Sequence, residues 1–248
     1  MTSHSPSLSF EVFPPNPTVG NETIIPALKE MQDLAPHFIS VTASNRKFNI
    51  EETTVRLADF IYNDLQIPTI AHLPAVYLTK EMVSDTLEAL DRVGVHKVLA
   101  LRGDIVPNME PKKDFTYATD LIEYIKEQAP HFEIISACYP EGHPDSLDRV
   151  SDIKNLKKKV DAGCSSLVTQ LFFDNERFYD FQERCTLAGI EIPIHAGIMP
   201  ILNRNQALRL LKTCENIHLP RKFKTILDKY EYNPESLRAA GLAYAIDQ

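Results

Sequence analysis

Glycine is scarce in this chain of 248 residues, which has 8 glycines against 17 prolines and no tryptophan. A glycine-rich phosphate loop needs closely spaced glycines, and neither G-x-G-x-x-G nor G-x-x-x-x-G-K-[ST] occurs in the sequence. These absences exclude the common dinucleotide-binding fingerprint and the P-loop.

Long apolar runs and a basic, apolar N-terminal leader are also lacking, so we expect neither a membrane span nor a signal peptide. The four cysteines, Cys138, Cys164, Cys185 and Cys214, are 26, 21 and 29 residues apart and form no C-x-x-C pair. This spacing predicts buried thiols in a reducing compartment and no metal site. A net charge of −8, from 26 basic and 34 acidic residues, argues against a nucleic-acid partner. We expect a cytoplasmic protein.

Short β-rich runs alternate with longer segments that have the apolar spacing of helices. The runs are Leu8–Phe13, Phe38–Thr42, Thr69–Leu73, Lys97–Leu101, Glu133–Tyr139, Leu167–Phe173 and Ile192–Ile198. Strand–helix alternation of this kind predicts an α/β fold with a parallel sheet, and the near-constant period favours a TIM-type (β/α)8 barrel of about 250 residues. No linker divides the chain, so we expect residues 1–248 to form a single domain.

Polar residues recur where these runs end. They are Glu11, Thr42, His72, Asp104, Tyr139 and Gln170, separated by 31, 30, 32, 35 and 31 residues. Ligand sites of parallel α/β folds form at the carboxyl ends of strands, so these side chains are the candidate site.

Two carboxylates in this set are candidates for a catalytic or ligand-binding role. Glu11 is adjacent to Phe10 and precedes Val12-Phe13-Pro14-Pro15, an environment that raises a carboxyl pKa and suits a general acid; it could instead cap backbone groups or pair with Arg102. Asp104 could bind a ring N–H of a ligand, or form a salt bridge with Arg102 or cap a helix. Gly103 would let the backbone approach a ligand closely.

The remaining candidates each have a functional and a structural interpretation. His72 is either a ligand contact or a satisfied core histidine, and Tyr139 and His143 either stack on a flat cofactor or form a half-buried wall. Asp152, Asn155 and Lys159 share a helical stripe that would suit a ribose, a base and a diphosphate, although charge runs usually form solvated faces. Gln170 either binds a polar heterocycle or is satisfied internally.

Eight segments, in order along nearly the whole chain, resemble the methylenetetrahydrofolate reductase family. They are Ser9–Pro15, Ser40–Thr42, Ala71–Leu73, Ala100–Asp104, Tyr139–Pro144, Asn155–Gly163, Thr169–Asp174 and Gly197–Pro200. The resemblance implies a flavoprotein of one-carbon and methionine metabolism. In such a protein NAD(P)H reduces FAD, and the flavin then reduces 5,10-methylenetetrahydrofolate to 5-methyltetrahydrofolate.

The resemblance also implies roles for individual residues. Glu11 matches the family's acid, Asp104 the carboxylate between flavin and pterin, and Gln170 and Gln206 match substrate contacts. The positions that match FAD contacts are Thr42, His72, Arg102, Gly103, Asp104, Tyr117, Ala118, Tyr139, His143, Asp152, Asn155, Lys158 and Lys159. NAD(P)H and methylenetetrahydrofolate would be the small-molecule partners, and we expect a homo-oligomer without membrane association.

The sequence departs from the family pattern in two places that bear on the site. After Thr42 the chain reads Ala43-Ser44-Asn45-Arg46-Lys47 in place of a glycine-containing loop, and the eighth strand that closes the family's barrel has no counterpart before Gln248. We therefore expect a barrel truncated at its C-terminus, with strands one and seven left as open edges. Two alternatives stay open, a non-catalytic flavin-binding or assembly subunit of the same family, and a barrel hydrolase with a Glu11/Asp104 carboxylate pair.

Overall fold

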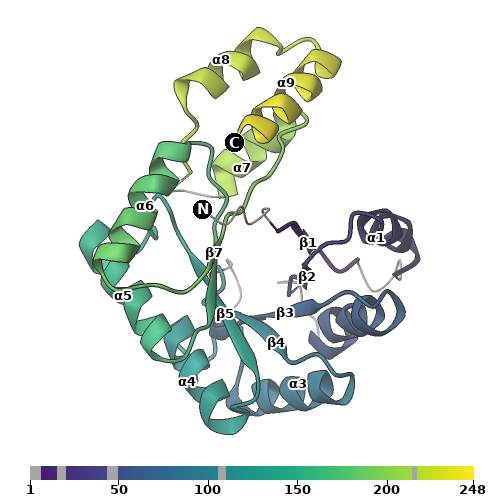
Figure 1. Ribbon diagram of the computed structural model, residues 1–248, viewed down its shortest axis with the longest axis vertical. Coiled ribbons are helices and arrows are strands. Elements are labelled where there is room, and N and C mark those ends of the chain that lie inside the picture. Colours follow the sequence, from purple (N-terminus) through teal and green to yellow (C-terminus); the bar gives the residue numbers. More distant parts are fainter. Residues whose placement is uncertain (1–6, 16–20, 44–49, 106–109, 214–216) are drawn as a thin grey trace, which may run out of the picture. The chain divides into compact units, whose positions relative to one another are not determined.

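The computed structural model describes residues 7–15, 21–43, 50–105, 110–213 and 217–248 (Figure 1). The chain divides into two compact units, a first unit of residues 1–136 and 162–165 and a second unit of residues 137–161 and 166–248. The loop predicted to depart from the family pattern after Thr42 lies, except for Ala43, outside the described residues, as does Cys214.

Seven parallel strands are present, and they follow one another in chain order in the sheet, from β1 to β7. Their bounds are β1 Ser9–Val12, β2 Phe38–Val41, β3 Thr69–Pro74, β4 Lys97–Leu101, β5 Glu133–Cys138, β6 Ser166–Thr169 and β7 Ile194–His195. This is the fold of an α/β protein with an incomplete TIM-type barrel. All seven predicted strands are confirmed, and the described residues after β7 contain no eighth strand.

Helices separate the strands, as predicted. The α-helices are α1 Ile25–Gln32, α2 Arg56–Asp59, α3 Lys80–Arg92, α4 Ala118–Gln128, α5 Arg149–Asp161, α6 Asn175–Leu187, α7 Arg204–Thr213, α8 Arg221–Lys229 and α9 Pro234–Asp247. The helix predicted over Glu51–Leu65 is continuous but irregular, because α2 is flanked by π-helical turns at Glu51–Val55 and Phe60–Asp64.

The core of the first unit lies around β2 and β3, whose residues are all buried. The register pairs Glu11 of β1 with Ser40 of β2, and Val41 of β2 with Ala71 of β3. Thr42 and His72 directly follow that last pair, so the carboxyl ends of neighbouring strands bring the two side chains to the same edge of the sheet.

Helices α3 and α4 of the first unit lie side by side (Figure 1), joined by a 3.0 Å hydrogen bond between the Ser84 and Tyr124 hydroxyls. The start of α3 is set by Thr79, whose side chain accepts a hydrogen bond from the Met82 backbone N–H at 3.2 Å. The apolar face of the helix then buries Val83 and Leu87 at a four-residue step.

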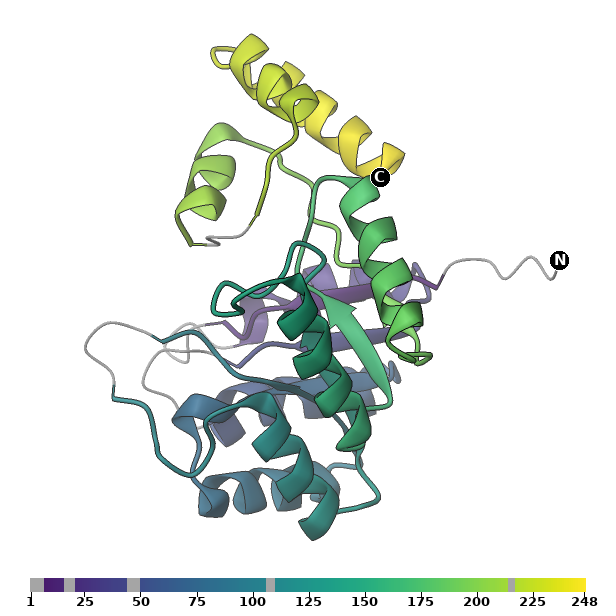
Figure 2. The same ribbon diagram turned by 90° about the vertical axis from the view of Figure 1, so that its left-hand side faces the viewer.

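The second unit has its own apolar core in the region after β6. Its buried members are Phe173, Ile201, Ala207, Leu210, Leu219 and Phe223. Helices α8 and α9 form a pair beside this core (Figure 2), and the α9 residue Gly241 approaches the chain so closely that a Cβ there would lie 1.9 Å from the Ile201 carbonyl oxygen. Only glycine fits at this contact.

The described cysteines Cys138, Cys164 and Cys185 are buried and form no disulfides, as predicted. Within the described ranges, no helix combines the length and the apolar character needed to cross a lipid bilayer.

Candidate active site

Glu11 and His72 face each other in the first unit. The Glu11 Oε2 and His72 Nε2 atoms are 3.8 Å apart, with the glutamate side chain 48% exposed and the histidine side chain 8% exposed. Burial lowers the pKa of His72 to about 4, so its imidazole is neutral near pH 7 and the contact is not an ion pair. Partial burial raises the pKa of Glu11. A raised carboxyl pKa is in the direction that a general acid requires.

Thr42 lies at the next strand end and is held by its backbone. Its N–H donates to the Val12 carbonyl oxygen at 2.9 Å, and its own carbonyl accepts a hydrogen bond from the Thr54 hydroxyl at 3.1 Å. The Thr42 Oγ1 and His72 Nε2 atoms are both buried, and neither has a hydrogen-bond partner among the described residues. Two unsatisfied buried polar atoms at neighbouring strand ends are unusual in a folded protein and point to a polar ligand.

Arg102, Gly103 and Asp104 lie in the loop directly after β4. The Arg102 carbonyl accepts a hydrogen bond from the Val76 N–H at 2.9 Å. Gly103 has φ +87°, and a Cβ at this position would lie 3.0 Å from the Pro74 Cβ. The glycine therefore turns the strand end sharply and presents an exposed Asp104 side chain.

Tyr117 and Ala118 begin α4, also in the first unit. The Asp120 carboxylate accepts hydrogen bonds from the backbone N–H groups of Thr116 and Tyr117, both at 2.8 Å, which fixes the helix start. Ala118 is buried, whereas the Tyr117 ring is exposed and available to a ligand.

In the second unit, Asp152 organises the loop after β5. Its Oδ1 atom accepts hydrogen bonds from the His143 backbone N–H at 3.1 Å and from the Ser146 hydroxyl at 2.9 Å. The Tyr139 and His143 rings pack edge to face with centroids 4.7 Å apart. The buried carboxylate of α5 thus holds the two predicted cofactor-contacting rings in one rigid loop.

The predicted helical stripe of Asp152, Asn155 and Lys159 has separate local partners. The Lys159 ammonium donates to the Ala137 carbonyl at 2.7 Å, while the exposed Asn155 accepts a hydrogen bond from Lys158 at 3.1 Å. Lys159 and Asp152 therefore each link α5 to the end of β5 or the loop that follows it, and the solvated-face interpretation suits only the outer part of the stripe.

The two predicted glutamine contacts differ in their bonding. Gln170 is exposed, and its Oε1 atom accepts a hydrogen bond from the Leu171 N–H at 3.0 Å. The Gln206 carboxamide bonds at both ends to one loop, accepting from the Leu202 N–H at 2.9 Å and donating to the Pro200 carbonyl at 3.1 Å. In this arrangement Gln206 braces the loop between β7 and α7.

A family model described as methylenetetrahydrofolate reductase matches residues 1–248. The chain belongs to the methylenetetrahydrofolate reductase family. It is 32% identical over 241 residues to the 5,10-methylenetetrahydrofolate reductase of Pectobacterium carotovorum, covering 97% of this chain and 79% of that protein. It is also 32% identical over 256 residues to methylenetetrahydrofolate reductase (NADH) 1 of Arabidopsis thaliana, covering 97% of this chain and 43% of the plant protein.

Among solved structures, a Clostridium thermocellum protein described as binding two copies of 5-methyl-5,6,7,8-tetrahydrofolic acid has a TM-score of 0.65. The match covers 98% of this chain and 84% of the Clostridium thermocellum chain. At 15% sequence identity it supports the fold alone.

Three residues of this methylenetetrahydrofolate reductase family member support the site but were not predicted from the sequence. The Thr54 hydroxyl donates to the Thr42 carbonyl, and the Ser146 hydroxyl donates to the Asp152 carboxylate. The Arg184 Nη2 atom donates to the Pro140 carbonyl at 3.1 Å, in the loop after β5. No periodic pattern in the sequence distinguishes a serine or threonine with such a role from one that faces solvent. A single arginine on α6 is likewise typical of a surface residue.

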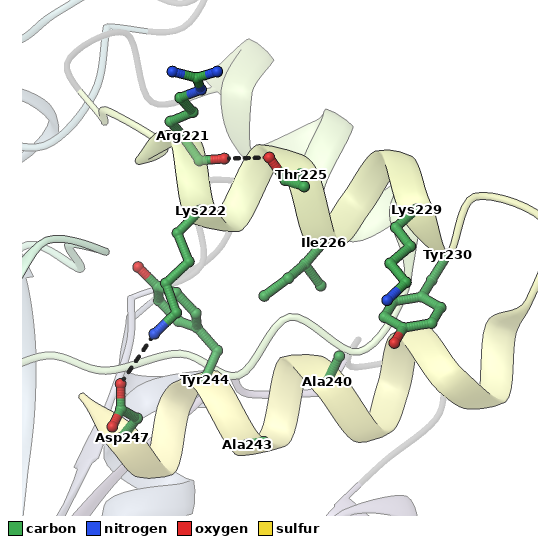
Figure 3. A pocket seen from close by; sticks show the side chains of 10 residues that line it. All are labelled: Arg221, Lys222, Thr225, Ile226, Lys229, Tyr230, Ala240, Ala243, Tyr244 and Asp247. Atoms are coloured by element: carbon green, nitrogen blue, oxygen red, sulfur yellow. Dashed lines mark hydrogen bonds and ion pairs between the residues drawn. The ribbon is translucent and has the colours of Figure 1, made fainter.

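A cavity of about 830 Å³ lies between α8 and α9 of this family member, and its lining includes none of the predicted site residues (Figure 3). Ile226 and Ala240 lie in its apolar wall, and the Lys222 ammonium lies 5.7 Å from the centre of the Tyr244 ring and 3.5 Å from the Asp247 carboxylate. Because the Lys222 ammonium already has Asp247 as a local partner, we do not assign this hollow to the candidate active site.

Proposed function

We propose that this chain is a flavin-dependent reductase that converts 5,10-methylenetetrahydrofolate to 5-methyltetrahydrofolate with NAD(P)H as the electron source. The observation that carries the proposal is the group of side chains at the strand ends of the first unit. There, a carboxyl group with a raised pKa faces a neutral histidine whose Nε2 atom, like the buried Thr42 Oγ1 atom, has no hydrogen-bond partner among the described residues. The family membership of the chain supports the same reaction.

FAD fits the residues that would hold it. The Thr42 Oγ1 and His72 Nε2 atoms would each gain the hydrogen bond they lack. The exposed Tyr117 ring offers a flat apolar surface at the start of α4. In the second unit, Tyr139, His143, Asp152, Asn155, Lys158 and Lys159 are the family-matched contacts for the remainder of the cofactor. When bound, FAD supplies the hydride chemistry.

Glu11 supplies the proton in this proposal. Opening the five-membered ring of methylenetetrahydrofolate leaves an iminium carbon, and protonation of a folate nitrogen by the Glu11 carboxyl group would favour that opening. His72 is neutral and poorly basic because it is buried, so it does not draw the proton from Glu11. Its role is to bind and orient, while Asp104 and Gln170, both exposed, would hold the pterin.

The absorption spectrum of the purified protein tests the proposal. After reconstitution with FAD, we expect a flavin spectrum that NADH or NADPH bleaches under anaerobic conditions and that methylenetetrahydrofolate then restores. Failure to bind flavin would refute the proposal. Flavin that is reduced by the nicotinamide but not reoxidised by the folate would favour the alternative of a non-catalytic subunit.

A further inference from the structure

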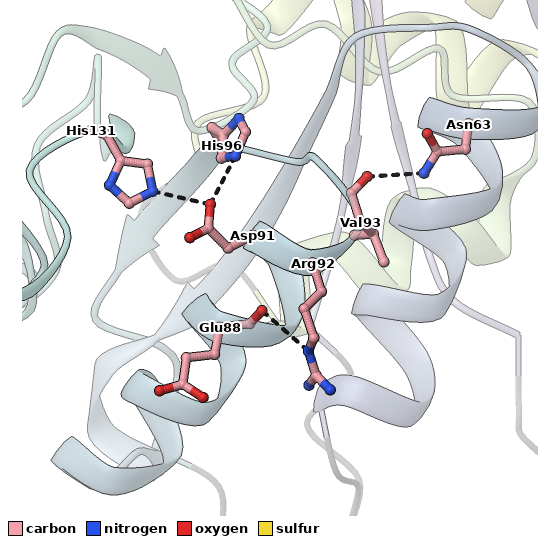
Figure 4. A network of polar contacts seen from close by, with 7 residues as sticks. All are labelled: Asn63, Glu88, Asp91, Arg92, Val93, His96 and His131. Carbon is pink, nitrogen blue, oxygen red and sulfur yellow. Dashed lines mark hydrogen bonds and ion pairs between the residues drawn. The ribbon is translucent and has the colours of Figure 1, made fainter.

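Three metal-ligating side chains meet on the surface of the first unit, and none of them is one of the predicted site residues. Asp91 lies in the last turn of α3, His96 immediately precedes β4 and His131 lies shortly before β5 (Figure 4). Their ligand atoms all lie within 4.8 Å of one another. The geometry points to a site for a zinc-type divalent cation, held by Asp91, His96 and His131.

One oxygen atom of Asp91 lies close to a ring nitrogen of each histidine. The Asp91 Oδ1 atom is 2.8 Å from the His96 Nε2 atom and 3.1 Å from the His131 Nε2 atom. Tetrahedral zinc with bonds of about 2.0–2.1 Å separates its ligands by roughly 3.3 Å, so the Asp91 oxygen would move away from each imidazole nitrogen by only a few tenths of an ångström. Three protein ligands leave the fourth position for water.

The backbone and a buried ring hold these ligands in place. The Glu133 N–H donates to the His96 carbonyl at 2.9 Å, which ties the segment before β4 to the segment before β5. Phe132, which is fully buried, packs against both imidazoles, with ring centroids 5.7 Å from His96 and 4.8 Å from His131. Ligands positioned by packing lose little freedom when an ion binds.

The surroundings favour a cation of this class. Asp91 lies near the C-terminus of α3, where the helix dipole disfavours a carboxylate and favours positive charge. Two imidazole nitrogens with one carboxylate suit zinc, cobalt, nickel or copper and not magnesium or calcium, which prefer oxygen ligands. The three side chains are 47%, 48% and 51% exposed, so an ion can reach them from solvent.

The site lies at the amino ends of β4 and β5, whereas Glu11, Thr42 and His72 lie at or near the carboxyl ends of their strands in the same unit. In barrels the carboxyl ends of strands carry catalysis and the amino ends serve stability. A bound ion would therefore link α3 to two strand starts and stabilise the first unit without taking part in the proposed reduction.

Zinc titration of the purified, metal-stripped full chain tests this inference. We expect one equivalent of Zn²⁺ to bind and to raise the unfolding temperature, and Co²⁺ to give the visible absorption of a tetrahedral site. Asp91→Asn, His96→Gln and His131→Gln should each weaken zinc binding by more than about tenfold. His37→Gln, at an exposed histidine outside the cluster, is the matched control and should bind like the wild type.

Two results would overturn the inference. One is a wild-type chain that binds no stoichiometric zinc, and the other is zinc affinity that is unchanged in all three ligand variants. Unfolding of each variant in excess chelator checks that the protein still folds. The cluster lies on the surface, so these unfolding temperatures should match the wild type.

Discussion

The Nε2 atom of His72 lies 3.8 Å from the Glu11 Oε2 atom, too far for a hydrogen bond, and no other group in the described part of the chain pairs with that nitrogen. An ion pair would raise the pKa of a histidine and lower that of a glutamate, but burial shifts both groups in the opposite directions. Glu11 therefore keeps its proton more readily, and His72 stays neutral, before any ligand enters.

Replacement of Glu11 by glutamine tests the proton donor. We expect Glu11→Gln to bind FAD and to be reduced by NAD(P)H at nearly the wild-type rate, because neither step needs the acid. Folate reduction should fall roughly 10²- to 10⁴-fold, the usual contribution of a general acid. Stopped-flow measurement of the two half-reactions separates these effects. Glu81→Gln, at an exposed position on α3, is the control, and equal loss in both half-reactions would assign Glu11 a binding role.

Acid should destabilise the first unit through His72. Its pKa is lowered to about 4 in the folded chain, from 6.5 for a free histidine, so the unfolded chain takes up a proton that the folded chain refuses. The free energy of unfolding should therefore decrease as the pH falls from about 6.5 toward 4, by up to about 3 kcal/mol.

Urea unfolding at several pH values measures this loss. The variant His72→Gln lacks the imidazole that the folded chain keeps unprotonated, so its unfolding free energy should fall less steeply with acid than that of the wild type. Parallel curves for the two proteins would show that His72 does not carry the pH dependence.

Removal of the Asp152 carboxylate should loosen the loop after β5. Asp152→Ala leaves the His143 N–H and the Ser146 hydroxyl without their acceptor, a change that typically costs about 1–3 kcal/mol. We expect a lower unfolding temperature and weaker FAD binding. Asp161→Ala on the same helix removes only the exposed ion pair with Lys157 and should change stability by less than about 1 kcal/mol. Equal effects of the two substitutions would contradict a special role for Asp152.

Gly241→Ala separates helix propensity from packing. In a helix interior alanine is more stable than glycine by about 1 kcal/mol, so propensity alone predicts a gain in stability. The 1.9 Å approach of a Cβ to the Ile201 carbonyl oxygen predicts a loss instead, because α9 must move away from that backbone. Denaturant unfolding gives the sign directly, and a gain would show that the contact is easily relieved.

Much of the fold could be predicted because the strands recur at a regular interval and end in polar residues. The bounds of β4 and α4 agree with prediction at both ends. The seventh strand is much shorter than the predicted Ile192–Ile198 run. It contains only Ile194 and His195, and just beyond it the Gly197 N–H bonds to the side-chain hydroxyl of Thr169 at 2.8 Å and not to a strand backbone. Such a tertiary contact has no signal in local composition.

The site could be predicted only in part, for a similar reason. Strand-end spacing predicted Glu11, Thr42 and His72 as candidates, but only the structure shows that the buried His72 Nε2 atom lacks a hydrogen-bond partner among the described residues. The Asp91 cluster went unpredicted because its ligands come from positions 91, 96 and 131, a spacing that matches no metal motif, and are brought together by the pairing of β4 with β5.

The chain-order pairing of the strands has a consequence for how this protein is made. The paired residues are separated by between 27 positions, as from Ala71 to Val98, and 36 positions, as from Lys97 to Glu133. Each pairing therefore closes a loop of similar length, with a similar entropic cost. Each strand pairs with the strand that precedes it in the chain, so its partner has already been synthesised. We therefore expect the sheet to assemble from β1 onward while the ribosome is still translating the rest, with each new strand docking on the one before it.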